Sequence, residues 1–227
     1  KIVVIVTGAT KGLGAAICAR LQSHNIKVFG LARNVSGLSF DGMDCDVSSY
    51  ESVKAVAKKL KNDKVKVTGL INAAGIASMN LAVITTPKIT QSIIQTNLVG
   101  AIYCCQIFSP LMFRNKKGSI INFSTIAVPL GLKGESVYVA SKAGIEGFSS
   151  SFAREAADFN VRVNCIAPGP INTDLLKGVH SKQIANIVSQ QVFPKQFAPS
   201  DVCDLVELLL DERSNSLSGQ VLNVGGV

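Results

Sequence analysis

Apolar residues in this chain alternate between short β-branched runs and longer segments with helical spacing. The runs predict strands at residues 2–6, 27–32, 42–45, 67–71, 119–123, 162–167 and 220–224. Helices are predicted between them, at residues 12–24, 50–61, 86–113, 136–159, 181–191 and 200–210. Several strands are apolar at successive positions, as expected when helices cover both faces of a parallel sheet. The alternation therefore predicts an α/β fold, a doubly wound parallel sheet of about seven strands with helices on both faces.

No linker, repeat or low-complexity tract interrupts residues 1–227, so we expect a single domain. Hydrophobic residues make up 47% of the chain and charged residues 17%, which excludes a disordered chain. The net charge of +8 suits nucleic acid, an anionic membrane or a phosphorylated ligand. Five cations precede the first acidic residue, Asp41, which concentrates the excess in the first predicted strand–helix units. Without a basic-aromatic stripe or helix-turn-helix signature, no nucleic-acid partner is expected.

The six cysteines form no C-x-x-C pair, and the chain has only two histidines, so no metal site is expected. We interpret them as buried thiols of a cytoplasmic protein, in preference to disulfides. The first residues predict a strand and no signal peptide. Residues 89–113 are uncharged yet carry several polar side chains, which favours a helix buried against the sheet or another subunit over a membrane span.

A glycine-rich turn follows the first predicted strand and opens the first predicted helix. Glycine lets a backbone approach a phosphate, and a new helix offers unpaired N–H groups to the anion. The spacing is Gly-x-x-x-Gly-x-Gly, so the turn is a moderate dinucleotide signal. Its candidate cofactor-binding residues are Gly8, Thr10, Lys11, Gly12, Leu13 and Gly14.

The residue after the second predicted strand bears on the choice of dinucleotide. A site for NAD usually places Asp or Glu there, on the ribose 2′-hydroxyl. This chain has Arg33 instead, and Lys11 lies inside the glycine turn. Both cations suit a 2′-phosphate, although two solvated surface cations would leave the same pattern. We therefore expect NADP(H) as cofactor.

Tyr138 and Lys142 lie four residues apart near the start of a predicted helix, so they share one face. A neighbouring ammonium favours a phenolate and lowers the phenol pKa. Reduction of a carbonyl by hydride needs such a group, because the developing alkoxide must receive a proton. On its own, this spacing is also common among surface residues.

Further motifs follow in order along the chain: Asp44–Val47, Asn72–Gly75, Asn97, Ser124–Thr125 and Pro168–Thr173. Together with the glycine turn and the Tyr–Lys pair, they resemble the short-chain dehydrogenase/reductase family over nearly the whole chain. Within that family the chain looks most like 3-oxoacyl-[acyl-carrier-protein] reductases. The resemblance implies a single-domain Rossmann fold and a homotetramer or homodimer. It implies that Tyr138 is the acid/base, that Lys142 binds the nicotinamide ribose and depresses the tyrosine pKa, and that Asn97 holds a water in a proton relay. Further implied cofactor-binding residues are Asp46, Val47, Asn72, Ala73, Ala74, Gly75, Pro168, Gly169, Ile171 and Thr173.

Two positions depart from the family pattern. The carbonyl-orienting serine commonly lies thirteen residues before the tyrosine, which is Thr125 here, and Ser124 comes one residue earlier. Adjacent strand residues face opposite ways, so only one is expected to serve, and we favour Thr125. A docking arginine for the acyl carrier protein is replaced by Phe159, although Arg114, Lys116 and Lys117 fit the basic patch that these reductases present near the site entrance. That patch equally suits a helix C-terminus.

The sequence thus predicts an NADP(H)-dependent oxidoreductase that interconverts a carbonyl and a secondary alcohol. A 3-oxoacyl thioester, linked to acyl carrier protein, is one candidate substrate, and a sugar or small-molecule ketone is another. A non-catalytic NADP-binding regulator is the alternative of a different class. Residues 175–199 are expected to form a mobile lid over the substrate.

Overall fold

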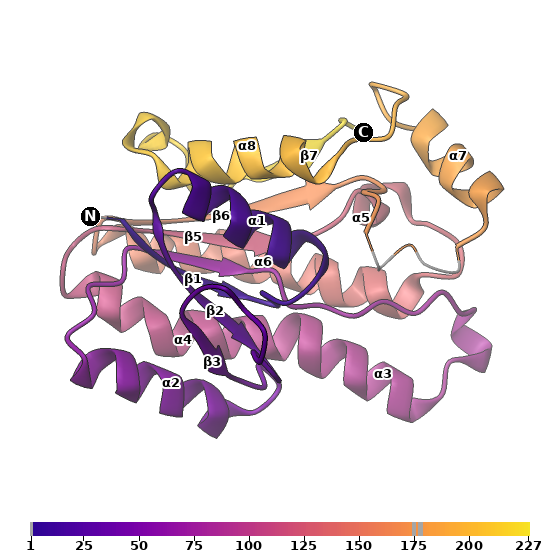
Figure 1. Cartoon of the computed structure of the whole chain (residues 1–227). Helices are drawn as coiled ribbons and strands as arrows, with labels where there is room; N and C mark the ends of the chain where they lie inside the picture. Colours follow the sequence, from indigo (N-terminus) through magenta and orange to yellow (C-terminus); the bar gives the residue numbers. More distant parts are fainter. Residues whose placement is uncertain (1, 174–175, 177–178) are drawn as a thin grey trace.

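Seven parallel strands form one sheet in the computed structural model, which describes residues 2–173, 176 and 179–227. The strands lie in the order β3-β2-β1-β4-β5-β6-β7 (Figure 1). Their bounds are Val3–Thr7 for β1, Lys27–Ala32 for β2, Gly42–Asp44 for β3, Gly69–Asn72 for β4, Gly118–Phe123 for β5, Val161–Pro168 for β6 and Val221–Val224 for β7. The predicted doubly wound sheet is confirmed. Chain order reverses between β1 and β4, where such sheets bind ligands.

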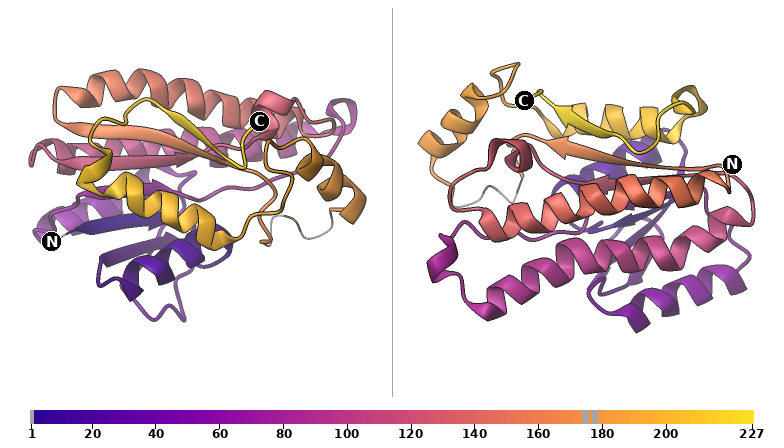
Figure 2. Two further views of the ribbon diagram at one scale, coloured as in Figure 1. Left: turned by 90° about the horizontal axis from the view of Figure 1, so that it is seen from above. Right: turned by 180° about the vertical axis from the view of Figure 1, so that it is seen from behind.

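Helices cover both faces of the sheet (Figure 2). On one face, Val4 and Val6 of β1 pack in a core with residues of α1, Gly12–Ser23, and α8, Pro199–Leu210. On the other face, Ile5 packs with residues of α2, Tyr50–Asn62, α4, Gly100–Phe113, and α6, Ser136–Ala157. Successive strand residues thus enter different cores, which explains why β1 is apolar at every position before Thr7. Further helices in the described residues are α3, Pro87–Ile94, α5, Ala127–Leu130, α7, Ser181–Ser189, and the 3-10 turns η1, Ala82–Ile84, and η4, Glu212–Ser214.

The helix predicted over residues 86–113 contains a wider turn. A π-helical segment, η2, spans Gln95–Val99 between α3 and α4, and the Gly100 N–H donates to the Gln95 carbonyl, five residues back. The Gln95 side chain leaves the helix and donates to the Ser48 carbonyl at 2.8 Å. The run Pro87–Phe113 contains an 18-residue window with a mean hydropathy of 1.3, so it could cross a membrane by length and composition alone, but 44% of that window is buried within the molecule. A helix of a protein core meets the same criterion.

A chain of buried polar side chains attaches α6 to the middle of the sheet. Asn72 of β4 donates to the Asn122 Oδ1 of β5 at 2.8 Å, and Asn122 Nδ2 donates to the Ser149 Oγ of α6 at 2.7 Å. The thiol of Cys165, on β6, donates to the same hydroxyl at 3.2 Å. Because buried polar groups are costly without partners, these bonds favour one position of α6 on the sheet.

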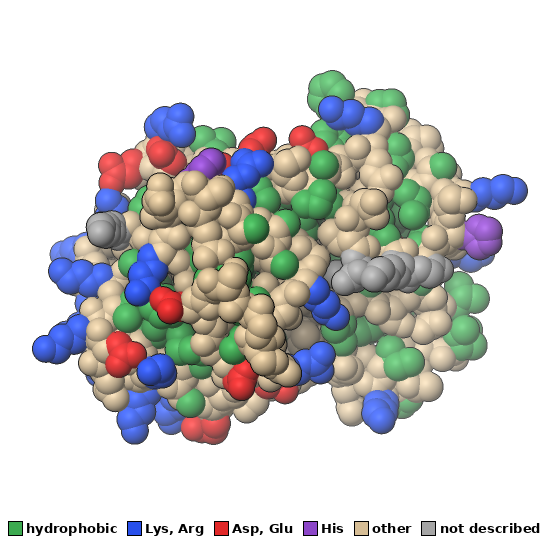
Figure 3. All heavy atoms as spheres, in the orientation of Figure 1, with side chains coloured by type: hydrophobic (Ala, Val, Ile, Leu, Met, Phe, Trp, Pro, Cys, Tyr) green, Lys and Arg blue, Asp and Glu red, His purple; other side chains and the backbone are tan. Residues whose placement is uncertain are grey.

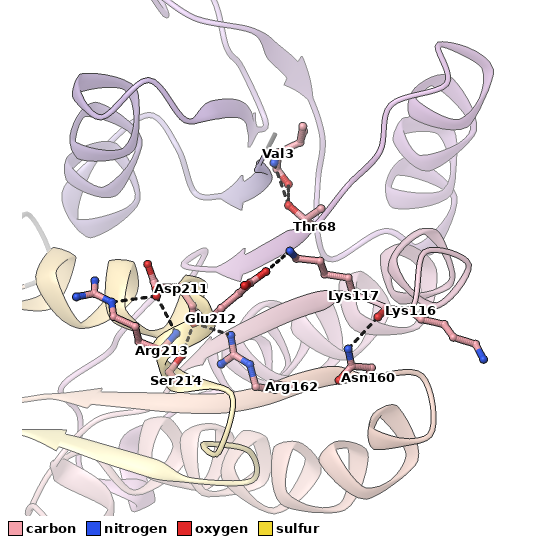
Figure 4. Close-up of polar contacts among 10 residues, drawn as sticks. All are labelled: Val3, Thr68, Lys116, Lys117, Asn160, Arg162, Asp211, Glu212, Arg213 and Ser214. Atoms are coloured by element: carbon pink, nitrogen blue, oxygen red, sulfur yellow. Dashed lines mark hydrogen bonds and ion pairs between the residues drawn. The ribbon is translucent and has the colours of Figure 1, made fainter.

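The amino edge of the sheet is closed by another set of polar contacts (Figure 4). Lys117 pairs with Glu212, and Arg162 Nη2 donates to the Leu209 carbonyl near the end of α8 at 2.8 Å. Asn160 donates to the Lys116 carbonyl at 3.0 Å. The basic patch of Arg114, Lys116 and Lys117 therefore lies at the amino end of β5. It does not border the ligand-binding edge of its own chain, contrary to our expectation for a docking patch at the site entrance.

Replacement of Ser149 by Ala should lower the free energy of unfolding by about 1–3 kcal/mol, because the buried Asn122 amide loses its acceptor. Urea unfolding monitored by circular dichroism would measure the change. Ser150→Ala, an exposed neighbour on the same helix, is the control and should stay within about 0.5 kcal/mol of the parent. Equal effects of the two substitutions would contradict a structural role for the buried chain.

Candidate active site

The carboxyl ends of the strands bring the predicted glycine turn against the segment that follows β4. Gly8 has a φ of +68°, and a Cβ there would lie 2.9 Å from the Ala74 Cα. The Ala74 N–H donates to the Thr7 Oγ1 at 3.0 Å, which ties the ends of β1 and β4 together. At Gly14 a Cβ would meet the Gly8 carbonyl oxygen at 2.2 Å. The turn therefore needs glycine at both positions.

This turn fits the diphosphate of a dinucleotide. Helix α1 begins at Gly12 without a side-chain cap, so the N–H groups of its first turn remain available to an anion. A Cβ at Gly12 would meet only the Thr173 side chain, at 3.8 Å, so Thr173 faces the turn from the segment after β6. Gly12 and Thr173, predicted from distant motifs, thus border the same space.

Cationic side chains accompany the turn. Lys11 and Arg33 are exposed, and Arg33 follows β2 directly, where the acid of an NAD site would lie. Asp44, on the neighbouring strand β3, accepts the Val35 N–H at 2.9 Å, and Asp46 accepts the Ser48 N–H at 2.9 Å. Figure 3 shows Lys and Arg side chains beside a hollow in this face of the molecule.

Tyr138 and Lys142 lie one turn apart on α6. The Lys142 Nζ is 5.8 Å from the centre of the Tyr138 ring and donates to the Phe123 carbonyl at 2.8 Å. Only 6% of Lys142 is exposed, and burial lowers the pKa of its ammonium from 10.5 to about 8. A Cβ at Gly75 would lie 3.7 Å from this ammonium and 3.4 Å from the Asn97 Oδ1. The lysine therefore faces the segment after β4, on the side of the glycine turn.

The pKa of the Tyr138 phenol is raised, opposite to the direction expected from the Tyr–Lys spacing. Burial is the largest cause, the Glu135 carboxylate adds to it, and a side-chain hydrogen bond with Thr125 acts in the other direction. Lys142 does not reverse this shift, because its ammonium is directed to the Phe123 carbonyl and its own charged form is disfavoured. The tyrosine is therefore a neutral O–H donor near neutral pH.

Asn97 lies in the π-helical turn and contacts both the segment after β4 and α6. Its Oδ1 accepts the Ile76 N–H at 2.8 Å, and its Nδ2 donates to the Ile76 carbonyl at 2.8 Å and to the Ser141 Oγ at 3.1 Å. Ser141 in turn donates to the Tyr138 carbonyl at 2.6 Å. Asn97 thus connects the wide turn to the first turns of α6.

Ser124 and Thr125 lie just beyond β5, which ends at Phe123, so the alternation of strand faces does not apply to them; their hydroxyls nevertheless have different partners. The Ser124 hydroxyl donates to the Glu146 carboxylate of α6, so its proton is engaged. The Thr125 Oγ1 accepts the Ala127 N–H at 3.2 Å, which leaves its own proton for the Tyr138 phenol or for a ligand. Of the two hydroxyls, Thr125 is the one that shares a site with Tyr138.

The remaining predicted residues divide between the edge and the interior. The Asn72 amide is directed into the buried polar chain, and Val47 packs against Gly100 of α4. Ala73 packs beneath the turn, Ile171 is buried, and Pro168 accepts the Ile126 N–H at 3.1 Å. Gly169 contacts the Gln191 side chain, which lies after α7. Of the expected lid, residues 175, 177 and 178 lie outside the described residues.

Sequence reasoning missed two carboxylates, Glu135 and Glu146. Both lie on α6 or at its start, at helical spacing from Tyr138 or Lys142, and that spacing was the available signal. Neither spacing distinguishes a carboxylate that points to the site from one that points to solvent.

Known proteins resemble this chain over almost its full length. The family model described as short chain dehydrogenase matches residues 2–184. The 3-oxoacyl-[acyl-carrier-protein] reductase FabG of Vibrio cholerae is 32% identical, covering 99% of this chain and 96% of its own. Carbonyl reductase family member 4 of Xenopus laevis is 33% identical, covering 97% and 95%. The ligand-free aldohexose dehydrogenase of Thermoplasma acidophilum superposes with a TM-score of 0.90 at 29% identity, covering 100% of this chain and 93% of its own.

Burial of Lys142 predicts a pH-dependent stability that its replacement removes. Between pH 8 and 10 the unfolded chain keeps a proton on this lysine that the folded protein has released. The free energy of unfolding therefore increases as the pH rises. Relative to Lys142→Met, the parent should gain on the order of 2 kcal/mol over this range.

Urea unfolding at several pH values would test this by the difference between parent and variant. The difference cancels the opposite contribution of the six buried cysteines, whose raised pKa lowers stability above pH 9. Lys58→Met, at an exposed position, should give a difference independent of pH. If the difference in unfolding free energy between the parent and Lys142→Met also did not change with pH, the ammonium would not be desolvated.

Proposed function

The chain belongs to the short-chain dehydrogenase/reductase family of nicotinamide-dependent oxidoreductases, and we propose that it interconverts a carbonyl and a secondary alcohol with NADP(H). The observation that carries this proposal is the convergence of Thr125, Tyr138 and Lys142 at the carboxyl edge, beside a glycine turn suited to a dinucleotide.

The chain's own residues account for the proton and for the position of the carbonyl. When bound, the nicotinamide supplies the hydride. Thr125 donates a hydrogen bond to the carbonyl oxygen, and Tyr138, whose raised pKa keeps it protonated well above neutral pH, donates the proton to the developing alkoxide. Lys142 binds the ribose and stabilises the tyrosinate that remains. Asn97 and Ser141 support the proton path from Lys142 by fixing the turn beside it.

Two exposed cations support NADP(H) over NAD(H). Lys11 and Arg33 are the residues in the turn and after β2 that suit a 2′-phosphate, and no acidic residue precedes Asp41. The guanidinium of Arg33 can form two parallel hydrogen bonds to a phosphate and stack beside an adenine. The relatives named as reductases of oxoacyl thioesters and carbonyls make these two groups the first substrates to test.

Removal of the two cations should weaken the use of NADPH more than that of NADH. We expect Lys11→Ala/Arg33→Ala to lower kcat/KM for NADPH about 10- to 100-fold and to change kcat/KM for NADH less than threefold. Arg154→Ala, exposed on α6, is the control and should change neither value. A parallel loss for both cofactors, or a parent enzyme that prefers NADH, would refute the NADP(H) proposal.

Replacement of Thr125 should affect the chemical step more than replacement of Ser124. We expect Thr125→Ala to lower kcat about 100-fold because the carbonyl oxygen loses a donor, and Thr125→Ser to restore most of it. Ser124→Ala should lower kcat less than tenfold. The measurement is NADPH oxidation with the best carbonyl from a set of acyl thioesters, sugar ketones and small diketones. Full activity of Thr125→Ala would transfer the role to Ser124.

A further inference from the structure

Glu135 is a buried carboxylate that the reaction described above does not use. Only 7% of the residue is exposed. It occupies the position before the first turn of α6, and its side chain accepts no helix N–H there. Among the residues that the structure describes, none donates a hydrogen bond to this carboxylate or pairs with it, and burial alone raises its pKa. The carboxylate oxygens are not among the fully buried unpartnered atoms, so they keep a narrow opening through which a ligand can donate to them.

The position of Glu135 relative to Tyr138 indicates where that donor comes from. Glu135 lies three residues before Tyr138 and Lys142 four residues after it, so the two charged groups flank the phenol along one helix face. Lys142 faces Gly75 and Asn97, on the side of the glycine turn. Glu135 lies at the opposite end, about 10 Å along the helix axis at 1.5 Å per residue. It is close enough to Tyr138 to raise the phenol pKa.

We infer that Glu135 is a substrate-binding residue that accepts a hydrogen bond from a hydroxyl group next to the reacting carbonyl. This inference rests on the proposed function, because the carbonyl is placed by Thr125 and Tyr138. It identifies the substrate class as a hydroxy ketone in the reducing direction and a vicinal diol in the other.

The same geometry disfavours other substrates. The carbon chain beside a 3-oxoacyl carbonyl offers no N–H or O–H to the carboxylate, which would stay unpaired in the complex. An ammonium would bring a second cation next to Tyr138, whose other side already holds the buried ammonium of Lys142. A neutral hydroxyl satisfies the carboxylate without either cost.

Hydroxyacetone and 2-butanone provide a matched pair of probes, since they differ by a hydroxyl in place of a methyl group. We expect the parent enzyme to show a kcat/KM at least tenfold higher for hydroxyacetone. Glu135→Leu should lower the ratio of the two values at least tenfold, and Glu135→Gln, which keeps an acceptor of the same size, should lie between. Glu155→Leu, at an exposed position of the same helix, should leave the ratio at its parental value.

Two results would overturn the assignment. Glu135→Leu and Glu135→Gln could lower kcat/KM for both ketones in parallel and shift the pH profiles of the two reactions alike. Glu135 would then act only through the charge that Tyr138 experiences. If the parent enzyme prefers aminoacetone to hydroxyacetone, the donor is an ammonium and the hydroxyl assignment fails.

Binding without turnover separates this inference from the proposed activity. The matched product alcohols, 1,2-propanediol and 2-butanol, can be titrated calorimetrically into the protein with NADPH bound, where no hydride transfer follows. We expect the diol to bind at least tenfold more tightly, and Glu135→Leu to abolish the preference. Diol preference without reduction of either ketone would refute the activity and support the hydroxyl site. Equal binding of the two alcohols by the parent would overturn the hydroxyl site whether or not ketones are reduced.

Discussion

The attachment of α6 to β5 and β6 is the constraint on which the site depends. Tyr138 and Lys142 are carried by the helix, whereas Thr125 follows the strand, so their separation is fixed only if helix and sheet keep one relative position. Three buried polar contacts hold it: Asn122 and Cys165 donate to Ser149, and Lys142 donates to the Phe123 carbonyl. Apolar packing alone tolerates sliding, whereas each of these bonds leaves a costly unpaired group when the helix moves. The contact that places Lys142 is thus also part of the packing.

That arrangement has an electrostatic cost that the fold bears. An ammonium and a carboxylate are both largely desolvated beside one phenol, and the pKa shifts of all three groups favour their neutral forms. Folding would be more favourable with apolar residues at these positions, as is common where activity requires polar groups in a buried place. The large apolar cores on the two faces of the sheet offset this cost.

The sequence was sufficient for the fold because each strand and helix pattern satisfied local rules. Strand β2 has the predicted bounds. In the other strands, the first and last residues lie at most two positions from those predicted. The short helix α5 was missed because four residues carry too little periodicity. At the candidate site, spacing identified Tyr138 and Lys142, whereas the choice between Thr125 and Ser124 assumed a strand that ends at Phe123, before both residues. Spacing could not reveal the direction of the Tyr138 pKa shift, since that depends on burial and on Glu135, which are properties of the packed structure.

The π-helical turn at Gln95–Val99 changes how the long helix must be counted. An α-helix advances about 100° per residue, so one inserted residue rotates everything before it by that amount relative to everything after it. The side of α3 that continues the buried stripe of α4 is therefore not the side that an ideal helical wheel would assign. An alignment or a design that treats Pro87–Phe113 as one regular helix would place its first residues a quarter-turn away from their true neighbours.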